Sequence, residues 1–247
     1  MRTSIAISRF ILFLVATFGL YGIFRILKPF KRDVIRWRQT IFRAWAKSFV
    51  YISDFEVEVV GEKPQAPFFL VSNHLGYIDI PIIRSQIETL YVSKSEVAEW
   101  PLAGRIVGDM GTIFIDRRNH RDIPRAGEEI LKSLSRGEGV VVFPEGTSGS
   151  GRDLLAINSS FFEFPASNGI PVVVMTLHYK TSEGDPEPSL SVSWWDETPF
   201  PRHIFNLFKL RRPSVTLRFG KAVSDENRKV LARQVEEEMR SSFIPMK

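Results

Sequence analysis

His74 and Asp79 are separated by four residues and follow the apolar run FFLVS at residues 68–72. Residues five apart lie about 140° from each other on an ideal helix, so a loop must fold back for the two side chains to meet. Gly76 lies between them and permits that fold-back. The Asp79 carboxylate can then accept a hydrogen bond from one imidazole nitrogen, which leaves the other nitrogen to take a proton from a hydroxyl. The pair resembles the base and orienting acid of a catalytic triad, without a nucleophile.

Two further apolar runs also end in polar side chains. They are residues 112–115 before Asp116 and Arg117, and residues 140–143 before Pro144, Glu145, Gly146 and Thr147. In open α/β sheets, ligands bind beyond the carboxyl ends of the strands, so we expect the three clusters to converge on one crevice. Taken alone, His74 and Asp79 also fit a structural pair, Arg117 and Arg118 a solvated pair, and Glu145 the cap of a turn.

Short apolar segments alternate with helical patterns after residue 54, which predicts an α/β fold with a largely parallel central sheet flanked by helices. A helix is predicted over residues 122–136, and a C-terminal helix with Ser224 as its N-cap is predicted to end before Pro245. The predicted strands are residues 55–60, 67–72, 89–92, 112–115, 140–143, 171–178, 190–194 and 215–219.

The composition excludes several kinds of chemistry. The chain has 247 residues, 44% of them hydrophobic, which is ample for a packed core. It contains no cysteine, so disulfides, thiolate metal sites and a cysteine nucleophile are excluded. His120, His178 and His203 lack metal-ligand spacing, and we expect no metal site. The Gly-x-Ser-x-Gly element of serine hydrolases is missing as well.

The positive charge is confined to the N-terminal part of the chain. Residues 1–53 hold ten Lys or Arg and one acidic residue, whereas residues 54–247 have a net charge of −4. A nucleic-acid-binding protein would carry its positive charge on the folded body. We therefore predict two parts, an N-terminal membrane-binding helical arm over 1–53 and an α/β domain over 54–247, with anionic lipids and not nucleic acid as the arm's partner.

The predicted arm begins with an uncharged run over residues 10–24, bounded by Arg9 and Arg25. At about 1.5 Å per residue this run spans roughly 22 Å, less than a hydrocarbon core of about 30 Å. A spanning helix and a half-inserted helix both remain possible, as do a cleaved signal peptide and a core helix. Residues 28–53 interleave basic and apolar side chains, as in a basic amphipathic helix at a membrane interface. If the first helix spans, this charge puts the remaining chain on the cytoplasmic side.

Four sequence blocks resemble the glycerolipid acyltransferase family in content and in order. They are Asn73-His74-x4-Asp79, Gly111 to Arg117, Phe143 to Thr147, and Gly169 to Val174. Lysophosphatidic acid acyltransferases, or 1-acyl-sn-glycerol-3-phosphate acyltransferases, are the best-known members. The resemblance is close over residues 68–178 and extends only to general layout elsewhere.

The resemblance implies transfer of a fatty acyl group from acyl-CoA or acyl carrier protein to the hydroxyl of a lysolipid at a membrane. It implies no metal, no cofactor and no covalent acyl-enzyme. Carried over by position, His74 is the general base and Asp79 orients it. Backbone N–H groups near the start of the helix after His74 are candidates for stabilising the oxyanion. The expected substrate-binding residues are Asn73, Arg117 (a phosphate ligand), Glu145, Gly146, Thr147 and Pro171 (near the acyl chain).

One residue departs from the family pattern. Phosphatidic-acid-forming members usually have Arg after Glu-Gly-Thr, where this chain has Ser148. A serine cannot bind a phosphate through two N–H groups of a charged side chain, which is the charged fork that an arginine supplies. Lysophosphatidate is the expected acceptor because its acylation is the commonest activity in the family, but another lysophospholipid or a lyso-ornithine-type aminolipid stays open. A non-catalytic lipid-binding protein of the same fold is a further alternative.

Overall fold

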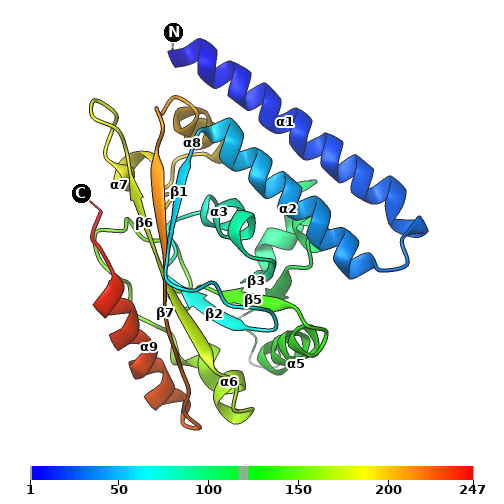
Figure 1. Ribbon diagram of the computed structural model, residues 1–247, viewed down its shortest axis with the longest axis vertical. Helices are drawn as coiled ribbons and strands as arrows, with labels where there is room; N and C mark the ends of the chain where they lie inside the picture. Colours follow the sequence, from blue (N-terminus) through cyan, green and yellow to red (C-terminus); the bar gives the residue numbers. More distant parts are fainter. Residues whose placement is uncertain (1, 117–118, 120–121, 247) are drawn as a thin grey trace.

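The computed structural model describes residues 2–116, 119 and 122–246. Within these residues seven strands form one sheet in the order β1-β7-β6-β2-β5-β3-β4 (Figure 1). The strands from β6 to β4 run parallel to one another, and β7 pairs antiparallel with β6. The predicted α/β fold with a largely parallel sheet is confirmed. The strands are β1 Glu56–Val60, β2 Phe69–Ser72, β3 Thr89–Lys94, β4 Ile113–Ile115, β5 Gly139–Val142, β6 Val172–Lys180 and β7 Ser214–Val223.

Helices cover both faces of the sheet (Figure 1). Alternate residues of a strand point to opposite faces, so Leu70 joins one apolar cluster while Phe69 and Val71 join the other. The first cluster lies against α2, α3 and α8, and the second lies against α5, α6 and α9. The helices are α1 Arg2–Leu27, α2 Val34–Ser53, α3 Asp79–Gln86, α4 Ala103–Asp109, α5 Asp122–Ser135, α6 Glu163–Ser167, α7 Pro188–Ser191, α8 Phe200–Leu207 and α9 Arg228–Ser242.

Two local predictions are wrong. The predicted strand 190–194 is instead the end of α7 and a loop, because Pro188 begins a helical turn and Ser191 Oγ donates to the Glu187 carbonyl. The C-terminal helix begins later than predicted. Its N-cap is Asn227, whose side-chain oxygen accepts from the N–H groups of the next turn, and not Ser224.

The N-terminal helices α1 and α2 pack against each other and against the body. One described stretch, Arg2–Phe30, is apolar and long enough to cross a membrane by length and composition, and most of it is exposed. The apolar face of α2, predicted to meet a membrane, is buried instead. The ring of Phe42 packs at a tilt against Phe24 of α1 with centroids 5.1 Å apart, and the ring centroids of Phe49 and Phe13 are 5.8 Å apart. Helical periodicity shows that a face is covered, but not what covers it.

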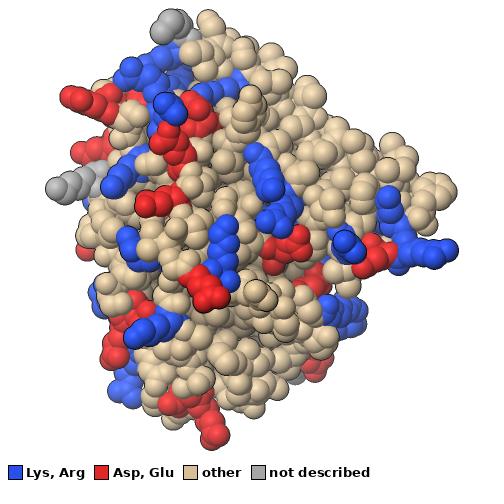
Figure 2. All heavy atoms as spheres, in the orientation of Figure 1, with Lys and Arg blue, Asp and Glu red and all other residues tan. Residues whose placement is uncertain are grey.

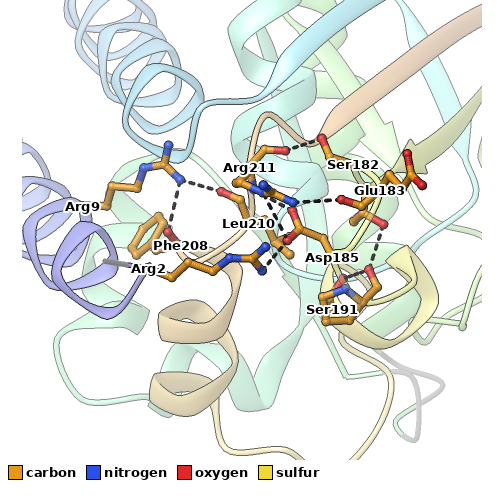
Figure 3. A network of polar contacts seen from close by, with 11 residues as sticks. Arg2, Arg9, Ser182, Glu183, Asp185, Ser191, Phe208, Leu210 and Arg211 are labelled. Atoms are coloured by element: carbon orange, nitrogen blue, oxygen red, sulfur yellow. Dashed lines mark hydrogen bonds and ion pairs between the residues drawn. The ribbon is translucent and has the colours of Figure 1, made fainter.

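Polar contacts fasten both ends of α1 to the body. Figure 3 shows Arg2 and Arg9 pointing toward the segment after α8 and the loop after β6. Arg9 donates to the carbonyls of Phe208 (3.2 Å) and Leu210 (2.8 Å), while Arg2 forms a 2.7 Å ion pair with Asp185. At the other end, Tyr21 and Arg25 both donate to Asp109 at the end of α4. Helix α1 is therefore held along the body rather than projecting from it.

Candidate active site

The predicted His74 and Asp79 pair is formed at the carboxyl end of β2. Asp79 is the first residue of α3 and fully buried, and its Oδ2 lies 2.7 Å from His74 Nδ1. The same oxygen accepts the backbone N–H groups of Leu75 (2.7 Å) and Gly76 (3.1 Å), and Oδ1 accepts the Tyr179 hydroxyl (2.8 Å). A helix N-terminus also favours a negative charge. The sequence did not single out Tyr179, although a tyrosine within an apolar strand usually needs a hydrogen-bond partner.

The hydrogen bond to Asp79 sets the state of the His74 ring. A carboxylate only accepts, so Nδ1 carries the proton and Nε2 is left as the basic nitrogen. The ring stacks on Phe143 at a centroid distance of 4.1 Å and lines a cleft of about 340 Å³. Its side chain is 22% exposed, so a substrate hydroxyl can reach it. This arrangement fits a general base.

Gly76 permits the fold-back of the loop, as the sequence predicted. Its φ is +153°, and a Cβ at this position would lie 3.0 Å from the Trp194 backbone nitrogen. That nitrogen donates to the Leu75 carbonyl (2.7 Å), while the Trp194 carbonyl accepts the Ser148 hydroxyl (2.6 Å). Trp194 therefore joins the loop after β2 to the loop after β5. Trp194 lies far along the chain in a segment predicted to be a strand, so this role could not be predicted from the sequence.

Asn73 holds the loop of residues 73–78, called the catalytic loop below after its predicted role, in place from inside the sheet. Its side-chain oxygen accepts from Leu177 N (2.7 Å), and its Nδ2 donates to Leu177 O (3.1 Å). The amide thereby continues the pairing of β2 with β6 by one residue. Asn73 is 1% exposed and does not line the cleft. The structure thus gives it a positioning role in place of the expected substrate contact.

Glu145, Gly146 and Thr147 follow β5 at the same edge of the sheet. Gly146 and Thr147 line the cleft, and Gly146 has a φ of +74° in the turn. Burial raises the pKa of Glu145 to about 8, against the opposing effect of the backbone N–H groups of His74 and Leu155. One of its carboxyl oxygens is buried without a hydrogen-bond partner among the described residues. The carboxyl group is therefore largely neutral at pH 7.

Glu145→Gln should change how thermal stability depends on pH. An unfolded glutamate loses its proton near pH 4.3, whereas folded Glu145 keeps it to about pH 8, so rising pH destabilises the wild type across this window. The amide cannot ionise. We expect the variant to melt near the wild-type temperature at pH 5 and roughly 3–10 °C above it at pH 9. Melting curves across this range test the prediction, with Glu237→Gln on α9 as the control. Differences that do not change with pH would contradict it.

Among the described residues, Pro171 lies away from the cleft. Pro171 is exposed and directly precedes β6, where Val172 pairs with Phe69 at the beginning of β2. His74 follows the other end of β2, so Pro171 lies at the opposite edge of the sheet from His74, and its place near the acyl chain stays a prediction. Arg117 lies outside the described residues. The backbone N–H groups of Leu75 and Gly76 bind Asp79, so these two are also not the oxyanion donors expected near this helix.

The cleft is lined mainly by apolar side chains. They come from β3, the segment before α4, α4 itself and the loops after β2 and β5, and they include Tyr91, Val97, Val107, Met110 and Phe143. Besides His74, Lys94 is the one basic residue among the described residues of the lining. A second cavity of about 270 Å³ shares Val92, Ile115, Val142 and Phe161 with the cleft and continues between α5 and the sheet. Among the described residues no group of three or more His, Asp or Glu could hold a metal ion.

Comparison with known proteins identifies the family. A sequence model described as Acyltransferase matches residues 56–178. The chain is 30% identical over 214 residues to the lyso-ornithine lipid O-acyltransferase of Pseudomonas aeruginosa, a match that covers 86% of this chain and 81% of that protein. The chain belongs to the acyltransferase family. The resemblance predicted from the four sequence blocks is confirmed.

Other acyltransferases match over most of their length. The 1-acyl-sn-glycerol-3-phosphate acyltransferase of Neisseria gonorrhoeae is 25% identical over 205 residues, which is 80% of this chain and 78% of that protein. The crystal structure of the LPA acyltransferase PlsC from Thermotoga maritima superposes with a TM-score of 0.70 at 21% identity, covering 98% of this chain and 96% of that one. The latter has the same fold as this acyltransferase.

Proposed function

We propose that this acyltransferase is an O-acyltransferase that moves a fatty acyl group from a thioester donor to the free hydroxyl of a lysolipid. The observation that carries this proposal is the 2.7 Å contact between His74 Nδ1 and Asp79 Oδ2 on a ring that lines an apolar cleft. A thioester is already an activated acyl donor, so neither a metal nor a cofactor is needed. Acyl-CoA and acyl carrier protein are both suitable donors.

The reaction proceeds by direct attack of the acceptor on the donor. His74 Nε2 takes the proton of the acceptor hydroxyl while its oxygen attacks the thioester carbonyl. The buried Asp79 stabilises the imidazolium that forms. When the tetrahedral intermediate collapses, the carbon–sulfur bond breaks and the leaving thiolate receives the proton from His74. The products are an O-acyl ester and a free thiol, and the base is regenerated.

For the acceptor we propose a lyso-ornithine-type aminolipid. At the position after Glu-Gly-Thr, Ser148 is neutral, and its hydroxyl is already engaged with the Trp194 carbonyl at 2.6 Å. It therefore offers no charged fork to a phosphomonoester. The Pseudomonas aeruginosa relative named above is a lyso-ornithine lipid O-acyltransferase, which supports this choice. Lysophosphatidate is the second candidate, favoured by the Neisseria relative and by Lys94 in the cleft.

A panel of substrates distinguishes the two acceptors. Full-length protein in mixed micelles is given labelled acyl-CoA or acyl carrier protein together with lyso-ornithine lipid, 1-acyl-glycerol-3-phosphate or lysophosphatidylethanolamine, and products are identified by mass. We expect the highest kcat/KM with lyso-ornithine lipid. A preference for 1-acyl-glycerol-3-phosphate would overturn the choice of acceptor, and no transfer to any lysolipid would overturn the proposed reaction.

One substitution tests the basis of this choice. Ser148→Arg places a charged fork at the cleft, so we expect it to raise kcat/KM for 1-acyl-glycerol-3-phosphate relative to lyso-ornithine lipid by about tenfold or more. Ser241→Arg adds the same charge at an exposed position of α9 and serves as the control. An unchanged ratio in Ser148→Arg would contradict the role given to Ser148.

For the acyl chain we propose the apolar cleft together with the second cavity, because the two share four lining residues. Donors with acyl chains of 12 to 18 carbons are added to the same panel. The dependence of the rate on chain length then reports how much of the cleft and the second cavity the acyl chain fills.

Membrane attachment is proposed through the exposed face of α1. This face carries large apolar side chains, including Ile11, Val15 and Phe18, that are 47–64% exposed. Figure 2 shows this edge of the molecule as mostly uncharged, with basic side chains near the α1–α2 turn. Because Arg2 and Arg9 fasten α1 to the body, we propose that the helix lies half-inserted in one leaflet, with the catalytic body on the cytoplasmic face.

A further inference from the structure

The carboxylate of Asp79 is held by donors from two distant parts of the chain. Its Oδ2 accepts from His74 and from two backbone N–H groups of the same loop. Its Oδ1 accepts from the hydroxyl of Tyr179, 100 residues further along the chain, at 2.8 Å. Among the described residues, Tyr179 is the one donor to this carboxylate that lies outside the catalytic loop and α3.

Tyr179 is itself fixed firmly in the core. It is fully buried on β6, where it pairs with Val215 of β7, and its ring meets Phe55 edge-on at 5.9 Å. Burial, and then the charge of Asp79, raises the pKa of Tyr179 well above its usual value. The phenol thus stays protonated and donates to Asp79 across the whole working pH range. A central strand is a more rigid support than a loop.

We propose that Tyr179 is a positioning residue for acyl transfer, which holds the Asp79 carboxylate in the orientation that aims Oδ2 at His74. This inference rests on the proposed function. The three donors on Oδ2 leave Oδ1 dependent on Tyr179, since Asp79 is buried away from water. Without the hydroxyl, Oδ1 becomes a buried acceptor without a partner, and the carboxylate gains freedom to rotate away from the imidazole.

The test is Tyr179→Phe, which removes one oxygen and keeps the ring. We expect kcat to fall roughly 5- to 50-fold while KM for donor and acceptor stays within about twofold. A carboxylate with one donor fewer is a stronger proton acceptor, so the His74 and Asp79 pair holds its proton to higher pH. The acidic limb of the kcat–pH profile should therefore move up by about half to one pH unit.

Thr176→Val is the matched control, because it also removes a buried hydroxyl from β6, here one that contacts Ser242 of α9. We expect it to leave kcat and the pH profile unchanged. A second variant separates positioning from folding. In an Asp79→Asn background, Tyr179→Phe should lower kcat less than twofold, since the interaction that it removes is already altered.

Four outcomes would count against the inference or the proposed function. An unchanged kcat and pH profile in Tyr179→Phe, or an equal loss in the Asp79→Asn background, overturns the inference. If Tyr179→Phe does not fold, 3-fluorotyrosine at position 179 keeps the shape and strengthens the donor, and it should move the acidic limb to lower pH; no movement overturns the inference. If wild-type protein transfers acyl groups to no lysolipid, the proposed function itself fails, which is distinct from failure of the variant alone.

Discussion

His74→Ala is expected to lower acyl transfer by roughly 10²- to 10⁴-fold, the range that general base catalysis contributes. The ring is partly exposed and stacks on Phe143, so its loss removes a base, one aromatic contact and one donor to Asp79 Oδ2, which keeps its two backbone N–H donors. The melting temperature and binding to vesicles should stay close to wild type. The rate is measured with labelled donor and the preferred lysolipid in mixed micelles.

His178→Gln provides the control for this substitution. His178 lies on β6 outside the cleft lining and contacts the Ile244 carbonyl at 2.9 Å. We expect its turnover to stay within twofold of wild type. Near-normal turnover in His74→Ala would refute the mechanism, whereas loss of folding in that variant would leave His74→Gln as the substitution to measure.

The triple substitution Ile11→Glu, Leu12→Glu and Val15→Glu is expected to release the protein from membranes. These side chains are 54%, 54% and 64% exposed on α1, so the change introduces three charges without disturbing the packed face. Full burial of one large apolar side chain contributes a favourable free energy of about 1.5–3 kcal/mol. We expect partitioning onto vesicles of phosphatidylethanolamine and phosphatidylglycerol to fall more than about 100-fold, with activity in detergent micelles retained.

The matched control carries the same three added charges at exposed serines elsewhere, Ser135→Glu, Ser167→Glu and Ser241→Glu. It should sediment with vesicles as the wild type does. Continued sedimentation of the α1 variant would mean that this face is not the main anchor. Deletion of residues 1–53 is a less clear test, because it also uncovers the core around Phe49, which is 2% exposed.

The sheet could be predicted because its central strands contain continuous apolar runs, at residues 68–71, 140–143 and 172–175. Such runs indicate strands buried on both faces, and polar residues after them indicate the carboxyl edge. That reasoning brought His74, Asp79 and Gly146 to one place correctly. Pro171 was expected in the site from the resemblance and not from this reasoning, and it directly precedes β6, at the edge opposite His74.

Long-range partners account for what the sequence could not predict. Tyr179 contacts Asp79 and Trp194 contacts Leu75 from 100 or more residues away, and local periodicity carries no information about such contacts. The buried face of α2 is a similar case. Its spacing of apolar residues is the same whether a membrane or other helices cover it, and only the tertiary arrangement shows that α1 and α3 do.

The attachment of α1 at both ends has a consequence for how lipids are selected. If α1 were joined to the body by a flexible linker, the body could change its tilt and its distance from the membrane surface. Here Arg9 at one end and Asp109 at the other fix the angle between helix and sheet. In the proposed half-inserted attachment, the imidazole of His74 stands at a constant height above the leaflet. We therefore expect lipids whose hydroxyl sits at that height to react, and headgroups of another length to be disfavoured even where no side chain touches them.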